Sequence, residues 1–128
     1  MNDTNVVVLK GRLVRGAELK QTNNGTYLTT FAIAVNETIK NAKGEYTNKA
    51  NYFDCTLWGN FSKSIHQYLT KGREVNITGR LRQDKWTSSD GKVLAKIDII
   101  VKEINLMRTP ADKNIPEPEP QEEEIPSF

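Results

Sequence analysis

Alternation of apolar and polar residues with a period of two is the feature that most constrains this 128-residue chain. It occurs in residues 27–36, 51–59 and 74–82, where one set of alternate positions is mainly apolar. Successive side chains of a strand point to opposite faces, so this pattern predicts strands that bury one face and expose the other. The chain is therefore expected to be built from strands that each bury one face in a core and expose the other face to solvent.

The segments around these stretches have signals of their own. Residues 6–14 and 92–107 are rich in branched residues and predict the first and last strands. A short extended piece at residues 18–21 leads to Asn24-Gly25, a dipeptide typical of hairpin turns. A second turn of this kind is predicted at residues 87–91, which end in Asp-Gly.

One helix is predicted, between the third and fourth main strands. Apolar residues recur at helical spacing from Phe61 through Ile65 to Leu69. Asn60 or Ser62 is expected to cap the start of this helix, and Lys71-Gly72 is expected to stop it.

Irregular positions inside the strands predict a sheet that bends and closes. Gly11 and Gly79 lie within strands, where glycine marks a bend or the close approach of another backbone. In the last strand the apolar phase slips by one residue, which predicts a bulge near Lys102-Glu103. The inward positions of the strand at 74–82 are expected to be Val75, Ile77 and Leu81.

These elements predict an all-β fold with one short helix. Residues 1–108 are expected to form a five-stranded Greek-key barrel of the oligonucleotide/oligosaccharide-binding kind, because five strands, a helix after the third and glycines within strands fit that architecture. A five-stranded sheet with another closure is the alternative. Residues 37–49 are polar and are expected to form a mobile loop with basic reach, carrying Lys43 and Lys49 near Tyr46.

Charge is distributed unevenly along the chain. Residues 1–108 carry 17 Lys and Arg against 10 Asp and Glu, whereas residues 109–128 carry one Lys against six acids. A basic body predicts a polyanionic partner, and the acidic end predicts a different role. Residues 109–128 have neither periodicity nor core-forming residues, and are expected to be a disordered acidic C-terminal tail.

The outward face of the strand at 51–59 has an unusual composition. Tyr52, Asp54, Thr56 and Trp58 alternate with the expected core residues of this strand, Phe53, Cys55 and Leu57. Trp86 follows an outward row of cations in the next strand, formed by Arg80, Arg82 and Lys85. Large rings interleaved with cations can hold single strands of nucleic acid without reading their sequence. The alternative is that the rings are structural and lie at a subunit contact.

Catalytic and metal-binding functions have little support. Cys55 lies on the inward phase and is expected to be a buried structural thiol, and His66 is the only histidine. Asp54, Glu74 and Asp84 with Asp98 would be the acids of a two-metal nuclease, but their strand phases do not converge. No cofactor-binding motif, membrane span or signal peptide is present, so the protein is expected to be cytoplasmic and not an enzyme.

Several motifs together resemble the bacterial-type single-stranded DNA-binding proteins. The resemblance covers about residues 4–108 and the last seven residues. It rests on these segments: Tyr52 with Leu57-Trp58-Gly59, Tyr68-Leu69-Thr70-Lys71-Gly72, Val75 with Gly79-Arg80-Leu81-Arg82, Lys85-Trp86, and the end Glu122-Glu123-Glu124-Ile125-Pro126-Ser127-Phe128.

The resemblance implies a barrel that assembles as a homotetramer and binds and protects single-stranded DNA in replication, recombination and repair. It implies stacking of bases on Tyr52, Trp58 and Trp86, with phosphates followed by Arg80, Arg82, Lys85, Lys71, Lys43 and Lys49. It also implies a tail tip that recruits DNA-processing proteins through Glu122, Glu123, Glu124, Ile125, Pro126 and Phe128. The alternative is a protein-interaction module of the same fold, of the primosome type, that binds DNA weakly.

The chain departs from the family pattern at four points. Ile39 stands where the family often has a fourth stacking ring, and Asp54 stands where it often has a cation. The linker before the tip is short, and Ser127 separates Pro126 from Phe128. The short linker and the altered tip suit a phage or mobile-element version of the family, and the protein is expected to act in the nucleoid or in the cytoplasm of an infected host.

Overall fold

The computed structural model describes residues 3–107. Within them, six strands are present together with one α-helix and a following turn of 3₁₀ helix. The strands are β1 (Val7–Leu13), β2 (Glu18–Gln21), β3 (Tyr27–Lys40), β4 (Tyr46–Trp58), β5 (Glu74–Thr87) and β6 (Val93–Leu106). The helix α1 spans Asn60–Ile65, and the 3₁₀ turn η1 spans His66–Tyr68.

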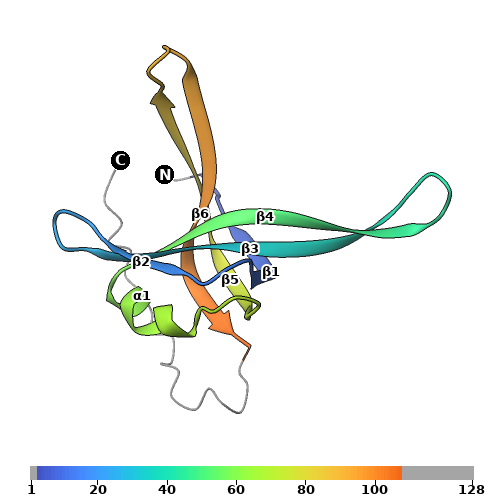
Figure 1. The fold of residues 1–128 in the computed structure, drawn as a ribbon, viewed down its shortest axis with the longest axis horizontal. Coiled ribbons are helices and arrows are strands. Elements are labelled where there is room, and N and C mark those ends of the chain that lie inside the picture. The colour runs from blue at the N-terminus through green and yellow to red at the C-terminus, as the bar shows by residue number, and fades with distance from the viewer. Residues whose placement is uncertain (1–2, 108–128) are drawn as a thin grey trace.

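Five of the strands close into a barrel. The hydrogen-bonded order is β1-β5-β6-β4-β3, and β1 pairs with β3 as well as with β5, which completes the ring. All of these pairings are antiparallel except β4 with β6, which is parallel. The extended piece at 18–21 forms β2, which adds to the edge of β3 (Figure 1). The predicted fold, a five-stranded oligonucleotide/oligosaccharide-binding barrel with one short helix, is confirmed.

The core fills the barrel and extends under the helix. Ile33, Leu57 and Ile99 are almost completely buried inside the ring of strands. Ile65 of α1 and Leu69 just after η1 belong to the same cluster, and α1 packs against β3 and β4. Burying apolar surface in one continuous cluster is the main favourable contribution to folding.

Two glycines permit the strands to cross closely, as their positions in the sequence predicted. A Cβ atom on Gly11 would lie 2.6 Å from the carbonyl oxygen of Ala34. A Cβ atom on Gly79 would collide with the carbonyl oxygen of Ile100. The register between β5 and β6 shifts beside Gly79, because Thr78 pairs with Glu103 and Gly79 with Val101. Lys102 is thus the extra residue, and the bulge predicted near Lys102-Glu103 is confirmed.

Two long hairpins, which we call the β3–β4 arm and the β5–β6 arm, project from the barrel in different directions (Figure 1). The loop predicted over residues 37–49 was wrong, since β3 continues to Lys40 and β4 begins at Tyr46. The turn between them is stabilised by the side-chain oxygen of Asn41, which accepts hydrogen bonds from the backbone N–H groups of Lys43 and Glu45. Both faces of this arm are exposed. Its two strands therefore pair without an alternation of apolar and polar residues, which is the pattern that predicts a strand from the sequence.

The β5–β6 arm explains a second error. The strand predicted to end at Arg82 continues to Thr87, so Trp86 lies within β5. Leu81, expected to point into the core, is 45% exposed, because beyond this point the two strands leave the barrel and their inward face covers nothing. The side-chain amide of Asn5 donates a hydrogen bond to the C=O of Leu81 and accepts one from the N–H of Leu81.

The helix is shorter than predicted. It ends at Ile65 instead of continuing toward Lys71-Gly72, and η1 follows it. Gly59 occupies the N-cap position and no side chain caps α1, so the predicted cap by Asn60 or Ser62 was wrong. The Ser62 hydroxyl donates to the carbonyl of Gly59 at 2.7 Å instead.

The tail and its predicted disorder lie outside the described residues, as does the tip from Glu122 to Phe128. Among the described residues, no helix has both the length and the apolar character needed to cross a membrane.

Candidate nucleic-acid interface

The outer face of β4 presents two of the three predicted rings. Tyr52 is 67% exposed. The residue paired with it on β3 is Ala34, whose side chain is too small to cover the ring. Trp58 lies at the end of the same strand and is half-buried. The inward residues Cys55 and Leu57 are buried in the core, as predicted for this strand. Thr56, predicted on the exposed outer face, is only 6% exposed, because its hydroxyl lies against Asp98 of β6.

The third ring, Trp86, comes from the β5–β6 arm and is 47% exposed. In the pairing of β5 with β6, Trp86 lies opposite Leu94. Two residues closer to the barrel on each strand, Asp84 lies opposite Lys96. Directly opposed residues of two paired strands point to the same face, and alternate residues share that face. Trp86 and Lys96 therefore lie on one face of the arm.

An ion pair joins this face of the arm to the outer face of β4. The ammonium of Lys96 lies 3.4 Å from Oδ2 of Asp54, which alternates with Tyr52 on β4. Deeper in the sheet, the hydroxyl of Thr56 donates to Oδ2 of Asp98 at 3.5 Å. The outer face of β4 and the Trp86 face of the arm thus meet at a common corner.

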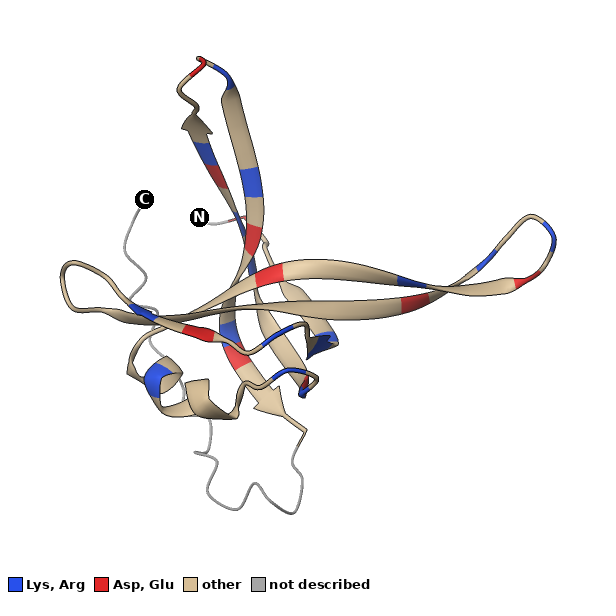
Figure 2. Ribbon diagram, in the orientation of Figure 1, with Lys and Arg blue, Asp and Glu red and all other residues tan. Residues whose placement is uncertain are grey.

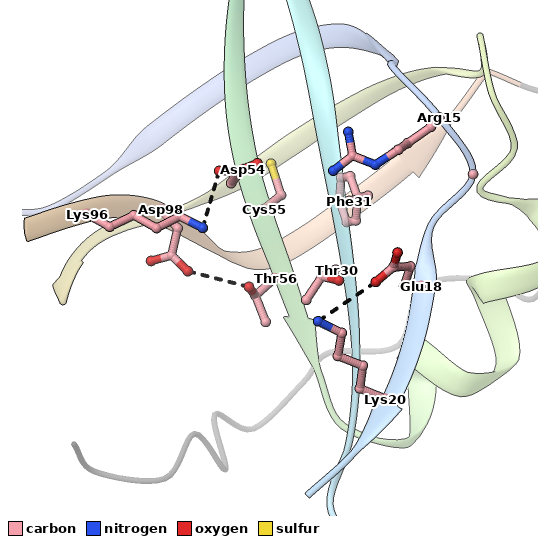
Figure 3. Close-up of a pocket in the computed structure, with 11 residues that line it drawn as sticks. Arg15, Glu18, Lys20, Thr30, Phe31, Asp54, Cys55, Thr56, Lys96 and Asp98 are labelled. Carbon is pink, nitrogen blue, oxygen red and sulfur yellow. Dashed lines mark hydrogen bonds and ion pairs between the residues drawn. The ribbon is translucent and has the colours of Figure 1, made fainter. Parts of the chain in front are cut away.

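A hollow of about 210 Å³, here called the corner pocket, lies beside this corner. Figure 3 shows Asp54 and Lys96 on one side of it, and Arg15 with Glu18 and Lys20 on the other. Its floor includes Thr30, Phe31, Cys55, Thr56 and Asp98. Both walls carry charges of both signs, so the corner pocket is polar without being simply basic.

Arg82 differs from the other predicted cations because it has an internal partner. Its guanidinium donates two hydrogen bonds to Asp98, at 2.8 and 3.2 Å, and the two side chains are only 14% and 10% exposed. Asp84 lies 3.7 Å from the same guanidinium. A fork of donors on one carboxylate is a strong, geometrically specific contact. Arg82 therefore holds β5 to β6 at the point where the arm leaves the barrel.

The remaining predicted cations are not gathered in one place. Lys85 is exposed but pairs with Ala95, so it lies on the face of the arm opposite to Trp86. Lys43 lies at the turn of the β3–β4 arm and Lys49 lies along its β4 strand, whereas Lys71 lies in the loop before β5. Figure 2 shows acidic residues interspersed among basic ones along both arms. Arg80, which is half-buried, lies on β5 near the barrel.

Lys96, Arg15 and Lys20 line the corner pocket but were not among the predicted site residues. Lys96 could have been found from its alternation with Leu94 and Asp98 on the polar side of the last strand. Nothing in the local sequence marks Arg15 or Lys20, because only closure of the barrel brings the segment between β1 and β3 beside β4.

Cys55 is a buried thiol, as predicted. Burial raises its pKa from 9.0 to about 12, and the nearby charges of Asp54 and Asp98 act in the same direction. The thiol is therefore protonated at neutral pH and is a poor nucleophile, even though Cys55 contributes to the floor of the corner pocket.

Comparison with known proteins matches this barrel to one family. The model of the single-strand binding protein family matches residues 4–107. A single-stranded DNA-binding protein of Treponema pallidum is 40% identical over 107 residues, which are 84% of this chain and 60% of that protein. The corresponding protein of Borreliella burgdorferi is 34% identical over 107 residues, which are 83% of this chain and 71% of that protein. The chain thus spans about 60% of the length of the Treponema relative.

Solved structures agree with the fold. A Plasmodium falciparum SSB in complex with ssDNA superposes with a TM-score of 0.75 at 27% identity, covering 84% of this chain and all of that one. A deletion mutant of the single-stranded DNA binding protein from Thermus aquaticus gives a TM-score of 0.74 at 19% identity, covering 84% of this chain and 52% of that one. The second likeness concerns the fold alone.

Proposed function

Because this chain belongs to the single-strand binding protein family, we propose that its barrel binds and protects single-stranded DNA in replication, recombination and repair, without catalysis. The observation that supports this most directly is the exposure of Tyr52 and Trp86 on faces that meet at the corner pocket. Rings with this much exposed surface are suited to stack on unpaired bases.

In this proposal bases stack on Tyr52, Trp58 and Trp86, while phosphates run along cations on the arms and barrel. The cations proposed for this role are Arg80, Lys85, Lys71, Lys43 and Lys49. Arg82 contributes by fixing the arm through Asp98, since its charge is already balanced there. The binding is sequence-tolerant because every base has a flat face on which a ring can stack.

A module of the primosome type, binding a protein instead of DNA, would bury these rings against its partner. The match of residues 4–107 to the single-strand binding protein family favours DNA binding over this alternative. The homotetramer and the recruitment of DNA-processing proteins through the tip from Glu122 to Phe128 are further parts of the proposal. So is a location in the cytoplasm, where replicating DNA is found in bacteria.

The test is a titration of tryptophan fluorescence with oligo-dT at several salt concentrations. Stacking on Trp58 and Trp86 should quench the fluorescence, and affinity should fall with a log–log slope of about −0.7 for each phosphate neutralised. Trp86→Ala should weaken binding by about 1–3 kcal/mol, the range known for rings of single-strand binding proteins, with little change in slope.

Duplex DNA is the matched competitor, because its bases are already stacked and do not reach the rings. Equal affinity for duplex and single strand would refute the stacking proposal. A gel of the bound strand with and without magnesium tests the proposed lack of catalysis, since a nuclease would shorten the strand.

A further inference from the structure

Tyr46, at the outer end of the β3–β4 arm, carries an aromatic ring that the interface described above does not include. It is the first residue of β4 and is 71% exposed, more than any other tyrosine or tryptophan of residues 3–107. The ammonium of Lys40 lies 5.9 Å from the centre of the ring, and one cation covers at most one face of it. The ring therefore has a flat surface available for stacking on a base.

The register of the arm places Tyr46 and Tyr52 on the same face. Tyr46 pairs with Lys40 and Tyr52 with Ala34, and the two rings are six residues apart along β4. Alternate residues of a strand share a face, and each residue rises about 3.3 Å, so the two rings lie about 20 Å apart along the strand. The paired strands form one twisted ribbon from the barrel to the turn, and this face follows the ribbon (Figure 1).

The side chains between the two rings on this face are small or uncharged. Asn48 and Ala50 lie on β4, and opposite them on β3 lie Thr38 and Asn36. The hydroxyl of Thr38 donates a hydrogen bond to the side-chain oxygen of Asn48 at 3.2 Å, so these two polar groups lie across the strands. Neutral side chains of this size do not repel phosphates. This face is therefore an open path between the two rings.

The opposite face of the arm carries an acid. Glu37 on β3 lies directly opposite Lys49 on β4. A phosphate near Lys49 would also approach the carboxylate of Glu37, and like charges repel. On the other face, the paired residues from Tyr46 to Tyr52 include one cation, Lys40, and no acid. A polyanionic strand is therefore better accommodated on the face that carries the two rings.

We propose that Tyr46 and Lys40 form a second stacking site for single-stranded DNA, and that the strand reaches it from Tyr52 along the face that carries Asn48 and Ala50. Tyr46 stacks on a base, while Lys40 binds a neighbouring phosphate. A strand with stacked bases advances about 3.4 Å per nucleotide, and a strand splayed over separate rings advances further, so about six nucleotides or fewer connect the two rings. This inference rests on the proposed binding of single-stranded DNA and adds to it the route of the strand along the β3–β4 arm.

The first test uses Tyr46→Trp in a protein whose own tryptophans are replaced by Trp58→Phe and Trp86→Phe, which keep a ring at both positions. Saturating oligo-dT should quench the fluorescence of this variant, because the new ring stacks on a base. The matched control is Thr47→Trp in the same background, since Thr47 is the exposed neighbour on the opposite face. Its fluorescence should be quenched much less. Equal quenching in the two variants would overturn the route along the Tyr46 face.

The second test measures affinity with the native tryptophans in place, from the quenching of Trp58 and Trp86. Tyr46→Ala should weaken oligo-dT binding about five- to tenfold, the lower end of the loss known for rings of single-strand binding proteins. Tyr46→Phe keeps the ring and should bind like the wild type, and Thr47→Ala should do the same. Circular dichroism checks that each variant is folded.

The results for Tyr46 and for the wild type bear on different proposals. If Tyr46→Ala binds as tightly as Thr47→Ala while the wild-type tryptophans are quenched normally, the second stacking site is wrong and the proposed function stands. If oligo-dT neither binds the wild-type protein nor quenches its fluorescence, the proposed function itself fails.

Discussion

At the scale of single residues, Cys55 shows how burial controls chemistry. Its pKa is raised to about 12, so between pH 9 and 12 the thiol ionises in the unfolded chain but not in the folded one. Stability from this group is therefore complete below pH 9 and is lost as pH rises toward 12, by up to roughly 4 kcal/mol. We expect the free energy of unfolding, measured with urea, to fall more steeply over this range than in Cys55→Val.

The valine variant keeps a similar volume and removes the titrating group, so other alkaline titrations cancel in the comparison. Thiol reagents should also react slowly with native protein at pH 8. Parallel pH profiles of the free energy of unfolding for the two proteins would show that folding does not raise the pKa of Cys55.

At the scale of elements, a well-buried ion pair reinforces the base of the β5–β6 arm. Arg82 and Asp98 join β5 to β6 where these strands leave the barrel, and both side chains are mostly buried. Removing one partner leaves an uncompensated buried charge, so Arg82→Ala should destabilise the protein by on the order of 3 kcal/mol in urea unfolding. Lys85→Ala, an exposed change three residues along, should be nearly neutral.

The double variant Arg82→Leu with Asp98→Leu separates charge from packing. It removes both charges and should recover much of the lost stability. If Arg82→Ala unfolds no more easily than Lys85→Ala, the pair is not holding the arm.

At the scale of the whole molecule, the charges of the body and of the tail oppose each other. Residues 1–108 have an excess of seven positive charges, whereas residues 109–128 have an excess of five negative charges. Within residues 3–107 the strands of the barrel and the helical segment form a continuous apolar core. We therefore expect deletion of residues 122–128 to leave the thermal unfolding midpoint unchanged. It should tighten DNA binding, mostly at low salt where screening is weak, and abolish capture of DNA-processing proteins.

A replacement tail isolates the contribution of charge. Changing Glu122, Glu123 and Glu124 to Gln keeps the length of the chain and should reproduce the tighter DNA binding. Full retention of protein partners by the deletion variant would remove the proposed role of the tip, whereas a lowered midpoint would show that the tip contributes to the fold.

The sequence alone determined most of the barrel, because closure leaves local signatures. Alternation in residues 27–36 and 51–59 predicted strands with one buried face. It correctly placed Tyr52 on the exposed face and Cys55 on the buried face. The slip of the apolar phase in the last strand predicted the bulge. Gly79 marked the same place, because the close crossing of two backbones there leaves no room for a side chain. These features depend on neighbours along the chain, and so they are visible in it.

The tertiary structure alone decided where strands continue beyond the barrel and which charges meet. Both faces of each arm are largely exposed at its outer end, so no hydrophobic pattern marks the continuation of β3 to Lys40 or of β5 to Thr87. The pairing of Lys96 with Asp54, and of Arg82 with Asp98, joins residues 42 and 16 positions apart through the register of β4, β5 and β6. Charge pairs of this kind have no local signature, because either residue alone is an ordinary polar position on a strand.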